Sequence, residues 1–596
     1  MSTKNIDRRG FLAGALASAG GLALAGAGLA APKTAFADES DAAKRAGNSG
    51  HVEAQWSFDV APEPPSADMI EEVIDCEIVI MGAGVTAMPA AMYAAKLGAD
   101  VHVIEKGTAI GNKRFGTCCF NSKFQLDAGI KFRREEVMAE AYAVSGGYQS
   151  RLDLWGMFFD YSGPTVDWIK DCLEAYNITI APSVDSKNTW TDADGKTWNA
   201  GTVDDPFWTG IQGFCQYAFV DPTKATGFYP EWLEAMHDYA EVNGAKFHFN
   251  LPGKQLIQAE DGTVTGLYAY NNYTGKYVQF NASKGVLIAS GGIEGDKEMV
   301  ARYAPDLIET VNDWSMIETK NTGDGQKMAI WAGADHDRAA LPGGFPFASV
   351  KDCNKMRPSI LPIGHQLFWS PTVSSMPVLM TNIAGERYQN EALQFCFSPM
   401  GSWSQPEGKT WSIWDAGWTE KVLPLVMANP RGLTYSVMNA WPTPDMLAEE
   451  VELGITIQAD SIEELAEKTG MDVETLKETI ERYNQMCAQG EDTDFLKSAR
   501  WLTPIDTPPY YAACTVNSLT GVIGGIKYDR HMRVVDTKGV GIPGLYTCGT
   551  ASGSFYGHAY PSNIVGCCMS HGQTFGILAV KDMLGIDFDE ALPAAY

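Results

Sequence analysis

A continuous apolar run over Cys76–Met81 leads directly into Gly82-Ala83-Gly84. Runs of this kind are typical of a strand that is buried on both faces of a parallel sheet. The pattern that follows predicts a helix over residues 85–97 and a second strand over Asp100–Glu105. Together these elements make a β-α-β unit, which constrains the chain to an α/β fold with a parallel sheet.

The residues of this turn match the fingerprint of dinucleotide-binding β-α-β units. Gly82 allows the tight turn, Gly84 lets the backbone approach a pyrophosphate, and Ala87 permits close packing of the helix on the strand. Glu105 ends the second strand 23 residues after Gly82, where a carboxylate can accept hydrogen bonds from a ribose diol. The sequence therefore predicts a dinucleotide site at this turn.

The N-terminus carries a separate signal. Arg8-Arg9 is followed by a run rich in Ala, Gly and Leu, and Ala35-Phe36-Ala37 has the A-x-A form of a cleavage site. This pattern predicts a twin-arginine signal peptide over 1–37, export to a periplasmic or other extracytoplasmic location, and no membrane insertion after the signal is removed. Residues 38–72 are polar with a proline cluster and are expected to be a linker.

Charge and cysteine usage limit the possible partners. The formal net charge of −28 argues against nucleic acid and anionic lipid, and suits either docking on a basic or haem-bearing protein or plain solubility. None of the twelve cysteines forms C-x-x-C or the C-x-x-C-H of covalent haem attachment. The sequence thus shows no motif for a covalent haem of its own. So many thiols indicate an anaerobic setting, or disulfides that the spacing does not assign.

Further elements are predicted along the rest of the 596 residues, a length that suits two or three packed domains. Thr274-Gly275 indicates a hairpin, residues 188–229 are expected to be a surface loop, and residues 341–506 change to proline-rich and aromatic-rich loops with a helical pair. The expected helices are Arg134–Tyr142, Leu152–Tyr176, Pro230–Asn243, the pair capped by Ser461 and Asp472 and ended by Gly470 and Gly490, and a last helix from about Gly566 to Leu584.

Several motifs follow the glycine turn in a fixed order. They are Val103-Ile104-Glu105-Lys106 with Gly111-Asn112 and Gly116, Ala289-Ser290-Gly291-Gly292, Thr322-Gly323-Asp324-Gly325, the Asn382 to Glu391 motif, Arg482-Tyr483-Asn484 with Asp492 to Phe495, and Ile542 to Gly549 with Thr574-Phe575-Gly576. In this order, from about 74 to 585, the chain resembles the fumarate reductase/succinate dehydrogenase flavoprotein superfamily, which also contains 3-ketosteroid dehydrogenases and urocanate reductases.

The resemblance implies a fold and a cofactor. It implies FAD, held by a Rossmann-like domain of the glutathione-reductase type in two segments, 73–340 and 507–596, with an α+β capping domain inserted at 341–506. In this family the cap closes over the flavin, and the N-terminus of the last helix faces the flavin pyrimidine. The positions that match cofactor-binding residues of the family are Gly82, Gly84, Ala87, Glu105, Lys106, Asn112, Gly116, Ala289, Gly291, Asp324, Gly549 and Gly566. No metal site is predicted.

The chain departs from the family at the residues that clamp a dicarboxylate. Phe395 occupies the position of the proton-donating arginine, the clamping arginine falls near Asn563, and the histidine falls near Leu519 or Thr520. A dicarboxylate would leave unpaired charge in a buried site, at a cost of several kcal/mol. Fumarate and succinate are therefore disfavoured as substrates.

The segment before the last helix supplies other candidates for catalysis. Tyr560-Pro561 resembles the ketosteroid dehydrogenases and related enone reductases, where a tyrosine hydroxyl hydrogen-bonds a substrate carbonyl or delivers a proton. The alternative is that Tyr560 packs and caps a turn. His558 is a second catalytic candidate, and Arg387 either donates protons or orders the capping domain.

These observations predict an FAD-dependent reductase, of the kind used in anaerobic respiration, that acts on a small molecule. Electrons are expected to reach FAD from a separate carrier such as a cytochrome, since the cysteine spacing shows no haem or iron–sulfur motif. Hydride would then pass from flavin N5 to a C=C bond conjugated to a carbonyl in an aromatic or polycyclic substrate. Three alternatives stay open: a 3-ketosteroid-type dehydrogenase, which runs the chemistry in reverse; a respiratory reductase of another unsaturated acid; and a flavin electron shuttle without substrate chemistry.

Overall fold

The computed structural model describes most of the chain from Trp56 onwards. The described residues are 56–111, 117–144, 150–182, 189–191, 197–199, 215–220, 231–310, 319–337, 341–348, 373, 376–393, 401–402, 404–422, 444–557, 560–561, 564 and 566–596. The predicted signal peptide and the first part of the predicted linker lie outside these residues. Within them, no helix combines the length and the apolar character that crossing a lipid bilayer requires.

An eight-stranded sheet forms the centre of the first lobe, in the order β17-β18-β11-β1-β2-β8, with β10 added to β11 and β9 to β10. The pairs β1·β2, β1·β11, β2·β8 and β11·β18 are parallel, and those made by β9, β10 and β17 are antiparallel. The strands are β1 Ile70–Met81, β2 Val101–Ile104, β8 Lys246–His248, β9 Gly253–Gln258, β10 Val264–Asn271, β11 Lys276–Ile288, β17 Arg533–Val535 and β18 Gly541–Thr547.

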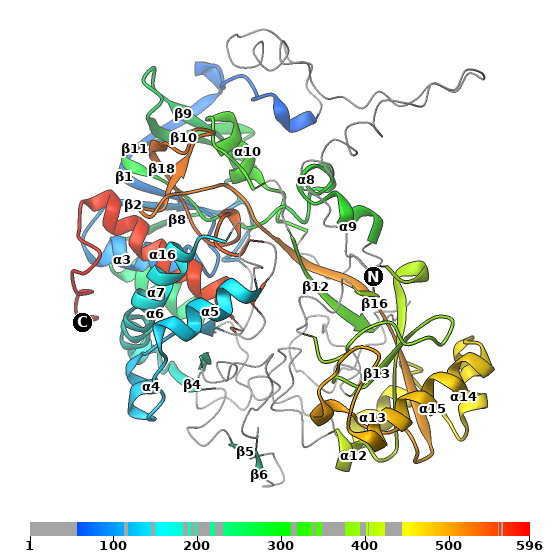
Figure 1. Cartoon of the computed structure of the whole chain (residues 1–596). Helices are drawn as coiled ribbons and strands as arrows, with labels where there is room; N and C mark the ends of the chain where they lie inside the picture. The colour runs from blue at the N-terminus through cyan, green and yellow to red at the C-terminus, as the bar shows by residue number, and fades with distance from the viewer. Residues whose placement is uncertain are drawn as a thin grey trace, which may run out of the picture. The chain divides into compact units, whose positions relative to one another are not determined.

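Helices cover this sheet (Figure 1), and α3, α6, α7 and α16 pack against one another on one side of it. The helices of this lobe are α3 Met88–Lys96, α4 Lys123–Asp127, α5 Arg134–Val144, α6 Leu152–Leu173, α7 Glu231–Val242, α8 Lys297–Tyr303, α9 Pro305–Thr310, α10 Asp324–Trp331 and α16 Cys567–Leu584. Residues Met88–Ala95 of α3 are all buried. A helix that is apolar all round belongs in the interior, and here it lies between the sheet and its neighbouring helices.

A second lobe is built on a five-stranded antiparallel sheet in the order β12-β16-β14-β13, with β15 paired to β16. Its strands are β12 Leu341–Ala348, β13 Leu379–Asn382, β14 Lys409–Asp415, β15 Thr456–Ala459 and β16 Tyr510–Ile523, and its helices are α12 Trp418–Lys421, α13 Pro444–Glu452, α14 Ile462–Thr469 and α15 Val473–Gln489. The mixed α/β fold with an inserted α+β part is thus confirmed. β16 joins this sheet although it follows the expected boundary at residue 506, and the domain limits stay predictions.

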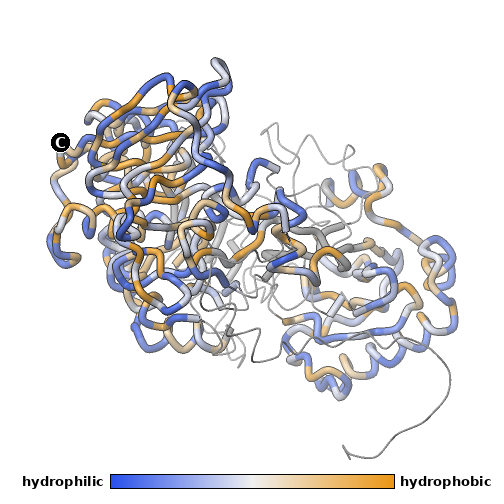
Figure 2. Tube along the Cα trace, turned by 90° about the horizontal axis from the view of Figure 1, so that it is seen from above, coloured by the Kyte–Doolittle hydropathy of each residue, from blue (hydrophilic) through white to orange (hydrophobic). Residues whose placement is uncertain are grey.

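The α14–α15 pair shows why local signals worked well in the second lobe. Ser461 Oγ accepts a hydrogen bond from the Glu464 N–H, and Asp472 accepts one from the Thr475 N–H. Gly470 and Gly490 are left-handed at the two C-termini. Figure 2 shows hydrophobic and hydrophilic segments alternating along the trace. Caps and periodicity therefore predicted both helices to within a residue.

Small sheets and short strands were predicted less well. β3 Thr117–Cys118, β7 Gln216–Val220 and β4 Thr179–Pro182 form a three-stranded sheet, and β5 Thr189–Thr191 pairs with β6 Thr197–Asn199. The expectation of a surface loop over 188–229 is wrong for its described parts, because these strands are three to five residues long and carry too little periodicity to be seen.

The linker prediction needs a similar correction. β1 begins at Ile70, and its polar first half pairs with Tyr277–Ala282 of β11. Phe58, in a short 3-10 helix at Ser57–Asp59, is buried against Met299 and Val522. Residues 56–72 thus belong to the folded part of the chain. The first half of β1 was not predicted because it is acidic. It is stabilised by pairing with β11 and not by burial of its own side chains.

Candidate cofactor and active site

The glycine turn after β1 lies where three strands of the sheet end. Gly82 has φ +105°, and a Cβ there would lie 2.6 Å from the carbonyl oxygen of Ala289. The Gly82 N–H donates to the Ile104 carbonyl at 2.8 Å, and the Ala289 N–H donates to the Met81 carbonyl at 3.0 Å. Only glycine fits this conformation and this contact, which locks the turn between the ends of β2 and β11.

Space is open where the sequence predicts a pyrophosphate. A Cβ at Gly84 would meet no atom within 4 Å, and Gly84 lies in the turn that leads into α3. Ala87 is fully buried at the start of that helix, and Pro89 occupies its first turn, where proline costs no hydrogen bond. The glycine turn at the start of α3 therefore leaves space that a phosphate can approach.

Glu105 is fixed by backbone groups on both sides. Its Oε2 accepts a hydrogen bond from the Ala83 N–H at 2.9 Å, and its Oε1 accepts one from the Gly107 N–H at 2.7 Å. A carboxylate has about four acceptor positions, so each oxygen keeps one for a ligand. The geometry suits a ribose diol, as the sequence predicts.

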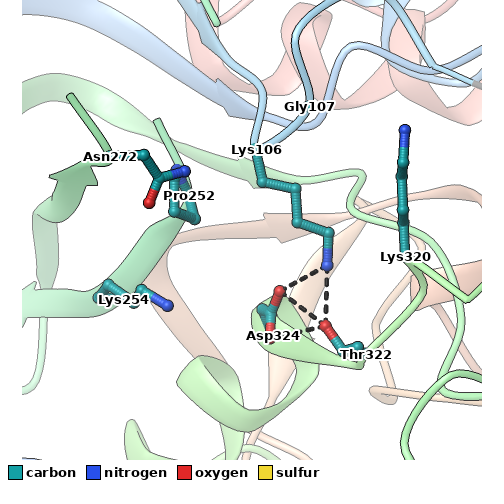
Figure 3. Close-up of a pocket in the computed structure, with 8 residues that line it drawn as sticks. All are labelled: Lys106, Gly107, Pro252, Lys254, Asn272, Lys320, Thr322 and Asp324. Carbon is teal, nitrogen blue, oxygen red and sulfur yellow. Dashed lines mark hydrogen bonds and ion pairs between the residues drawn. The ribbon is translucent and has the colours of Figure 1, made fainter. Parts of the chain in front are cut away.

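Next to Glu105, a pocket of about 360 Å³ opens at the carboxyl end of the sheet (Figure 3). Lys106 Nζ donates to Asp324 Oδ2 at 2.7 Å and to Thr322 Oγ1 at 2.8 Å. Two more lysines, Lys254 and Lys320, line the pocket. With three cationic side chains and one carboxylate, the pocket favours an anionic or nucleotide group, and it brings together the predicted residues Lys106 and Asp324.

Gly291 is explained by its neighbours. It has φ +85°, and a Cβ there would lie 2.5 Å from Asn321 Oδ1. The segment after β11 and the Thr322–Gly325 motif therefore pack directly against each other, with Gly323 left-handed at the start of α10. This contact accounts for the two motifs occurring together.

The third segment of the site is α16, which rests on the start of α3. Gly549, at φ +70°, and Gly576 face Thr86, with a hypothetical Cβ 2.7 Å from Thr86 Oγ1 and 2.9 Å from the Thr86 carbonyl oxygen respectively. Gly572 faces the same residue. The glycines let the last helix approach the dinucleotide turn closely. Thr86 and Gly572 were missed from sequence, although the spacing of Gly572 and Gly576, one helical turn apart, carried the signal.

Tyr560 caps the N-terminus of α16. Its Oη accepts hydrogen bonds from the N–H of Gly566 at 3.1 Å and from the N–H of Cys568 at 3.3 Å. Gly566 is left-handed at the N-cap. Burial, together with the neighbouring thiols, raises the pKa of Tyr560 well above its usual value, so the phenol is protonated at neutral pH. The cap holds the Tyr560 hydroxyl at the positive end of a helix. A catalytic role for Tyr560 stays a prediction.

Arg387 lies in the second lobe within a buried ion network. Its guanidinium donates to Glu391 through Nε and Nη2, both at 2.8 Å, and to Asp492 through Nη1 at 3.0 Å and Nη2 at 2.7 Å. Lys497 is a second cation on Glu391, at 3.1 Å. Burial alone would raise the pKa of Asp492, but the hydrogen bonds from Arg387 hold it well below its usual value. The arrangement favours ordering of the lobe over proton donation, and it joins the Asn382–Glu391 motif to the Asp492–Phe495 motif.

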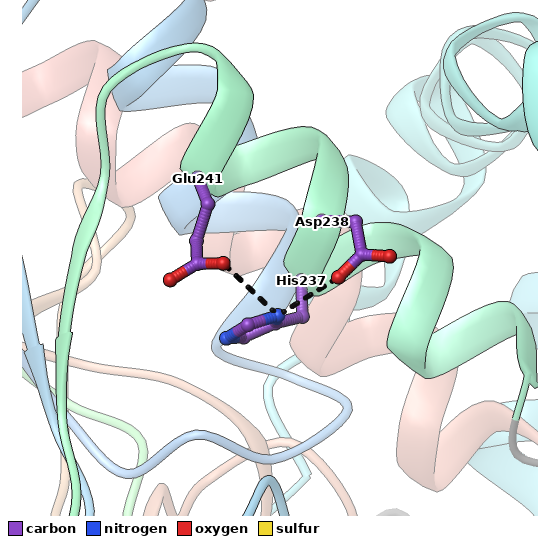
Figure 4. Close-up of side chains that lie close together, drawn as sticks. All are labelled: His237, Asp238 and Glu241. Carbon is purple, nitrogen blue, oxygen red and sulfur yellow. Dashed lines mark hydrogen bonds and ion pairs between the residues drawn. The ribbon is translucent and has the colours of Figure 1, made fainter.

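The remaining candidates fall in two groups. His558, Asn112 and Gly116 lie outside the described residues, as do Phe395 and Asn563. One cluster of possible metal ligands occurs among the described residues: His237 Nδ1 on α7 lies 3.2 Å from Asp238 and 3.8 Å from Glu241 (Figure 4). Both carboxylates are more than half exposed, so we interpret this group as a solvated helix face.

The ten described cysteines are all free thiols. Burial raises the pKa of most of them, for example to about 12 for Cys76 and Cys548, so they behave as small buried hydrophobic residues. No disulfide was assigned from the sequence, and none forms among these ten.

A glycine turn at the start of a helix, a fixed carboxylate beside it and a cationic pocket define an α/β protein that binds a dinucleotide. The family described as FAD binding domain matches residues 77–347 and 378–564, and the chain belongs to it. The cofactor is FAD.

Relatives agree on the chemistry in outline. Vinyl phenol reductase of Lactiplantibacillus plantarum is 27% identical over 83% of this chain and 93% of its own length. Urocanate reductase of Eggerthella lenta is 24% identical over 90% and 77%. A 3-oxosteroid 1-dehydrogenase of Mycolicibacterium smegmatis is 27% identical over 55% of this chain and 57% of its own. The chain is an FAD-dependent oxidoreductase of this group, whose members add hydrogen to carbon–carbon bonds or remove it.

Solved structures with the same fold include the open conformation of a flavocytochrome c3 fumarate reductase, with a TM-score of 0.60 and 21% identity over 89% of this chain and 82% of that one. The 3-ketosteroid delta1-dehydrogenase of Sterolibacterium denitrificans also has a TM-score of 0.60, with 22% identity over 86% and 99%. These likenesses establish the fold alone.

Proposed function

We propose that the protein reduces a carbon–carbon double bond conjugated to a carbonyl, in an aromatic or polycyclic substrate, with Tyr560 as the proton donor. The observation that carries this proposal is the setting of the Tyr560 hydroxyl, which accepts two backbone N–H groups at the start of α16. A phenol held in this way keeps its own proton for another acceptor. Its raised pKa keeps that proton in place at neutral pH.

Bound FAD supplies the hydride equivalent for such a reduction. The chain's own residues must then hold the cofactor, deliver a proton and stabilise charge. The pyrophosphate and the ribose of FAD are proposed to be held by Gly82, Gly84, Glu105 and Lys106. When Tyr560 gives up its proton, the N–H groups of Gly566 and Cys568 and the positive end of α16 stabilise the phenolate.

The substrate class rests on three supports. The sequence lacks the arginines and histidine that clamp dicarboxylates in the family, which argues against fumarate and succinate. One relative is named for a vinyl phenol, an aromatic compound with a side-chain double bond. A tyrosine precedes the last helix, where an acid can face a neutral carbonyl compound without leaving a buried charge unpaired.

The test is an anaerobic assay with a reduced viologen dye as electron source. The probes are an aromatic enone such as benzylideneacetone, 4-vinylphenol, a steroid enone, and fumarate as the comparison. We expect the aromatic enone to oxidise the dye and Tyr560→Phe to lower kcat at least about a hundredfold, the usual size of a general-acid contribution. Failure of every enone to reoxidise the flavin, with reduction by saturated ketones instead, would contradict the proposal.

A second candidate is a 3-ketosteroid-type dehydrogenase, favoured by the similarity to 3-oxosteroid 1-dehydrogenases. The same phenol would then polarise a ketone during removal of hydrogen. The two candidates differ in the direction of hydrogen transfer. In a dehydrogenase, a saturated ketosteroid reduces the flavin and bleaches its absorbance; in a reductase of double bonds it does not. A respiratory reductase of another unsaturated acid remains a further alternative, with urocanate as its probe.

We further propose that the protein works after export by the twin-arginine route and receives electrons from a separate carrier such as a cytochrome. The support is the Arg8-Arg9 pattern, the A-x-A site and the absence of haem-attachment motifs from the sequence. N-terminal sequencing of the exported protein should begin at Asp38. A mature protein that retains Arg8-Arg9 would contradict the export proposal.

A further inference from the structure

A strained turn lies on the path of the chain from the cofactor site to Tyr560. Ser554 has φ +68°, a left-handed conformation that residues other than glycine rarely adopt. The Phe555 N–H donates to the Gly553 carbonyl, two residues earlier, at 2.8 Å. The positive φ and this bond are those of the rare, strained form of the γ-turn. Such a conformation persists only where neighbouring groups hold it in place.

The carboxylate of Asp337 holds this turn. Its Oδ2 accepts a hydrogen bond from the Ser554 N–H at 2.8 Å. Asp337 and Ser554 are each 8% exposed, so the bond is shielded from most water. Gly553 leaves room for the carboxylate, since a Cβ there would lie 2.3 Å from Asp337 Oδ2. A hydrogen bond to a charged acceptor is roughly twice as strong as a neutral one, and it offsets the strain at Ser554.

Backbone contacts fix both Asp337 and the turn within the first lobe. The Asp337 N–H donates to the Gly525 carbonyl at 2.9 Å, which ties the segment after α10 to the segment after β16. The Ser554 carbonyl accepts the N–H of Arg151, the residue before α6, at 2.9 Å. Three separate segments of the chain therefore meet at this turn, and the carboxylate lies at their junction.

The turn connects two parts of the site. Gly549, which faces the dinucleotide turn, lies five residues before Ser554, and Tyr560 lies six residues after it. We propose that Asp337 is a positioning residue, whose carboxylate holds Ser554 in the left-handed turn and so sets the position of Tyr560 relative to the cofactor site. This inference rests on the proposed function, since it assigns Tyr560 the role of acid. When Asp337 takes up a proton, its bond to Ser554 loses the charge and the strained turn relaxes.

Asp337 changes its charge within the pH range of an assay. Burial raises the pKa of Asp337 to about 6. The charged and titratable groups around it are Lys527, which lowers this pKa, Asp335, which raises it, and His336, Tyr528 and Arg151. Burial lowers the pKa of His336 to about 4 and raises that of Tyr528, so neither changes its charge near pH 6. The carboxylate is therefore charged above about pH 6, where it holds the turn, and neutral below it.

Four substitutions separate the bond, the charge and the strain. Asp337→Ala removes the acceptor, whereas Asp337→Asn keeps an acceptor oxygen and carries no charge at any pH. Ser554→Gly removes the strain, because glycine adopts a positive φ freely. Asp335→Asn is the matched control, since Asp335 lies two residues before Asp337 and forms a partly exposed ion pair with Lys527. FAD content and thermal midpoint verify that each variant folds.

The readouts are kcat and KM, with the reduced dye and the enone that serves wild type best, and hydrogen exchange of the peptide that spans residues 553–560. In Asp337→Ala we expect kcat to fall about tenfold at unchanged KM, the equivalent of one hydrogen bond to a charged group. The peptide should exchange faster, because the turn is no longer held. Ser554→Gly in the Asp337→Ala background should recover most of the lost kcat.

The pH profile tests the charge separately. Wild-type kcat should fall as the pH drops through about 6, because Asp337 then loses its charge. Asp337→Asn should lack this step. Asp335→Asn should keep the wild-type kcat and the step, with the step at a slightly lower pH, because the charge of Asp335 raises the pKa of Asp337.

The possible failures are distinct. If wild type turns over no probe, or if Tyr560→Phe retains full turnover, the proposed function fails and this inference falls with it. If Tyr560→Phe is inactive while Asp337→Ala keeps the wild-type kcat and exchange, only the positioning role is overturned. A loss of kcat in Asp337→Ala that Ser554→Gly does not recover, or a pH step that persists in Asp337→Asn, likewise overturns it.

Discussion

The carboxylate of Glu105 accepts a hydrogen bond from the backbone N–H of Ala83 at 2.9 Å, across 22 residues of sequence. This bond ties the end of β2 to the middle of the glycine turn. Glu105 therefore has a structural role besides its proposed contact with a ribose, because it fixes the backbone of Ala83 between Gly82 and Gly84. Loss of the carboxylate is expected to disturb the turn and the cofactor together.

Glu105→Gln should weaken FAD binding by about ten- to a hundredfold, the size of a lost hydrogen bond to a charged group. The amide presents an NH2 group to one of two N–H donors and carries no charge. Glu77→Gln is the control, since Glu77 accepts the Asp100 N–H at 2.9 Å in the same sheet but far from the glycine turn along β1. FAD dissociation constants, measured by fluorescence, decide; equal affinities for both variants would contradict the role of Glu105.

Gly82→Ala should yield apoprotein that is less stable by about 2–5 kcal/mol, from a left-handed backbone and an overpacked contact with Ala289. Gly98→Ala separates the two effects. Gly98 has φ +78° but a Cβ there would meet nothing within 4 Å, so only about 1–2 kcal/mol is expected and FAD should stay bound. The measurements are the thermal midpoint and the ratio of flavin to protein absorbance. If the two variants lose equal stability, crowding at Gly82 is not the cause.

The fold was predictable to the extent that it is written in local patterns. The β1 turn, α3, the α14–α15 pair and α16 carry apolar runs, caps and stop glycines, and each was found close to its true limits. What failed was structure that depends on distant pairing. The polar first half of β1 becomes a strand only through β11, and the short strand β7 only through β3 and β4.

The site divides in the same way. The glycines and Glu105 could be placed from spacing, because a dinucleotide imposes one geometry on a β-α-β unit, and Lys106 could be placed from the family resemblance. The contacts of Tyr556 with Tyr560 and His571 could not be placed, since they arise from the turn of the segment that precedes α16. Arg387 was a candidate acid because of its motif. In the structure its guanidinium is paired with two buried carboxylates, Glu391 and Asp492, which favours a structural role.

Arg387→Met should destabilise the second lobe by about 3–5 kcal/mol, because it leaves Glu391 and Asp492 buried without their main partner. Arg482→Met is the matched control: its ion pair with Asp494 is formed by a side chain that is 60% exposed, and surface pairs of this kind contribute under about 1 kcal/mol. Urea unfolding followed by tryptophan fluorescence separates the two. If Arg387→Met is as stable as Arg482→Met but inactive, Arg387 takes part in the chemistry after all.

Stability should fall as the pH drops from about 6.5 to about 4. Burial lowers the pKa of His102, His336 and His571 to about 4 each, below the unfolded value near 6.5, so the unfolded chain binds more protons in this window and acid favours it. Asp337 opposes this, because burial raises its pKa to about 6 and the folded state binds its proton first. Burial also lowers the pKa of His248, so the net excess is at least about two protons and gives a slope of at least about 2–3 kcal/mol per pH unit. Thermal midpoints between pH 7 and pH 4.5 measure it, and Asp337→Asn should steepen the loss. A midpoint that is flat over this range would show that the three histidines are not held neutral by burial.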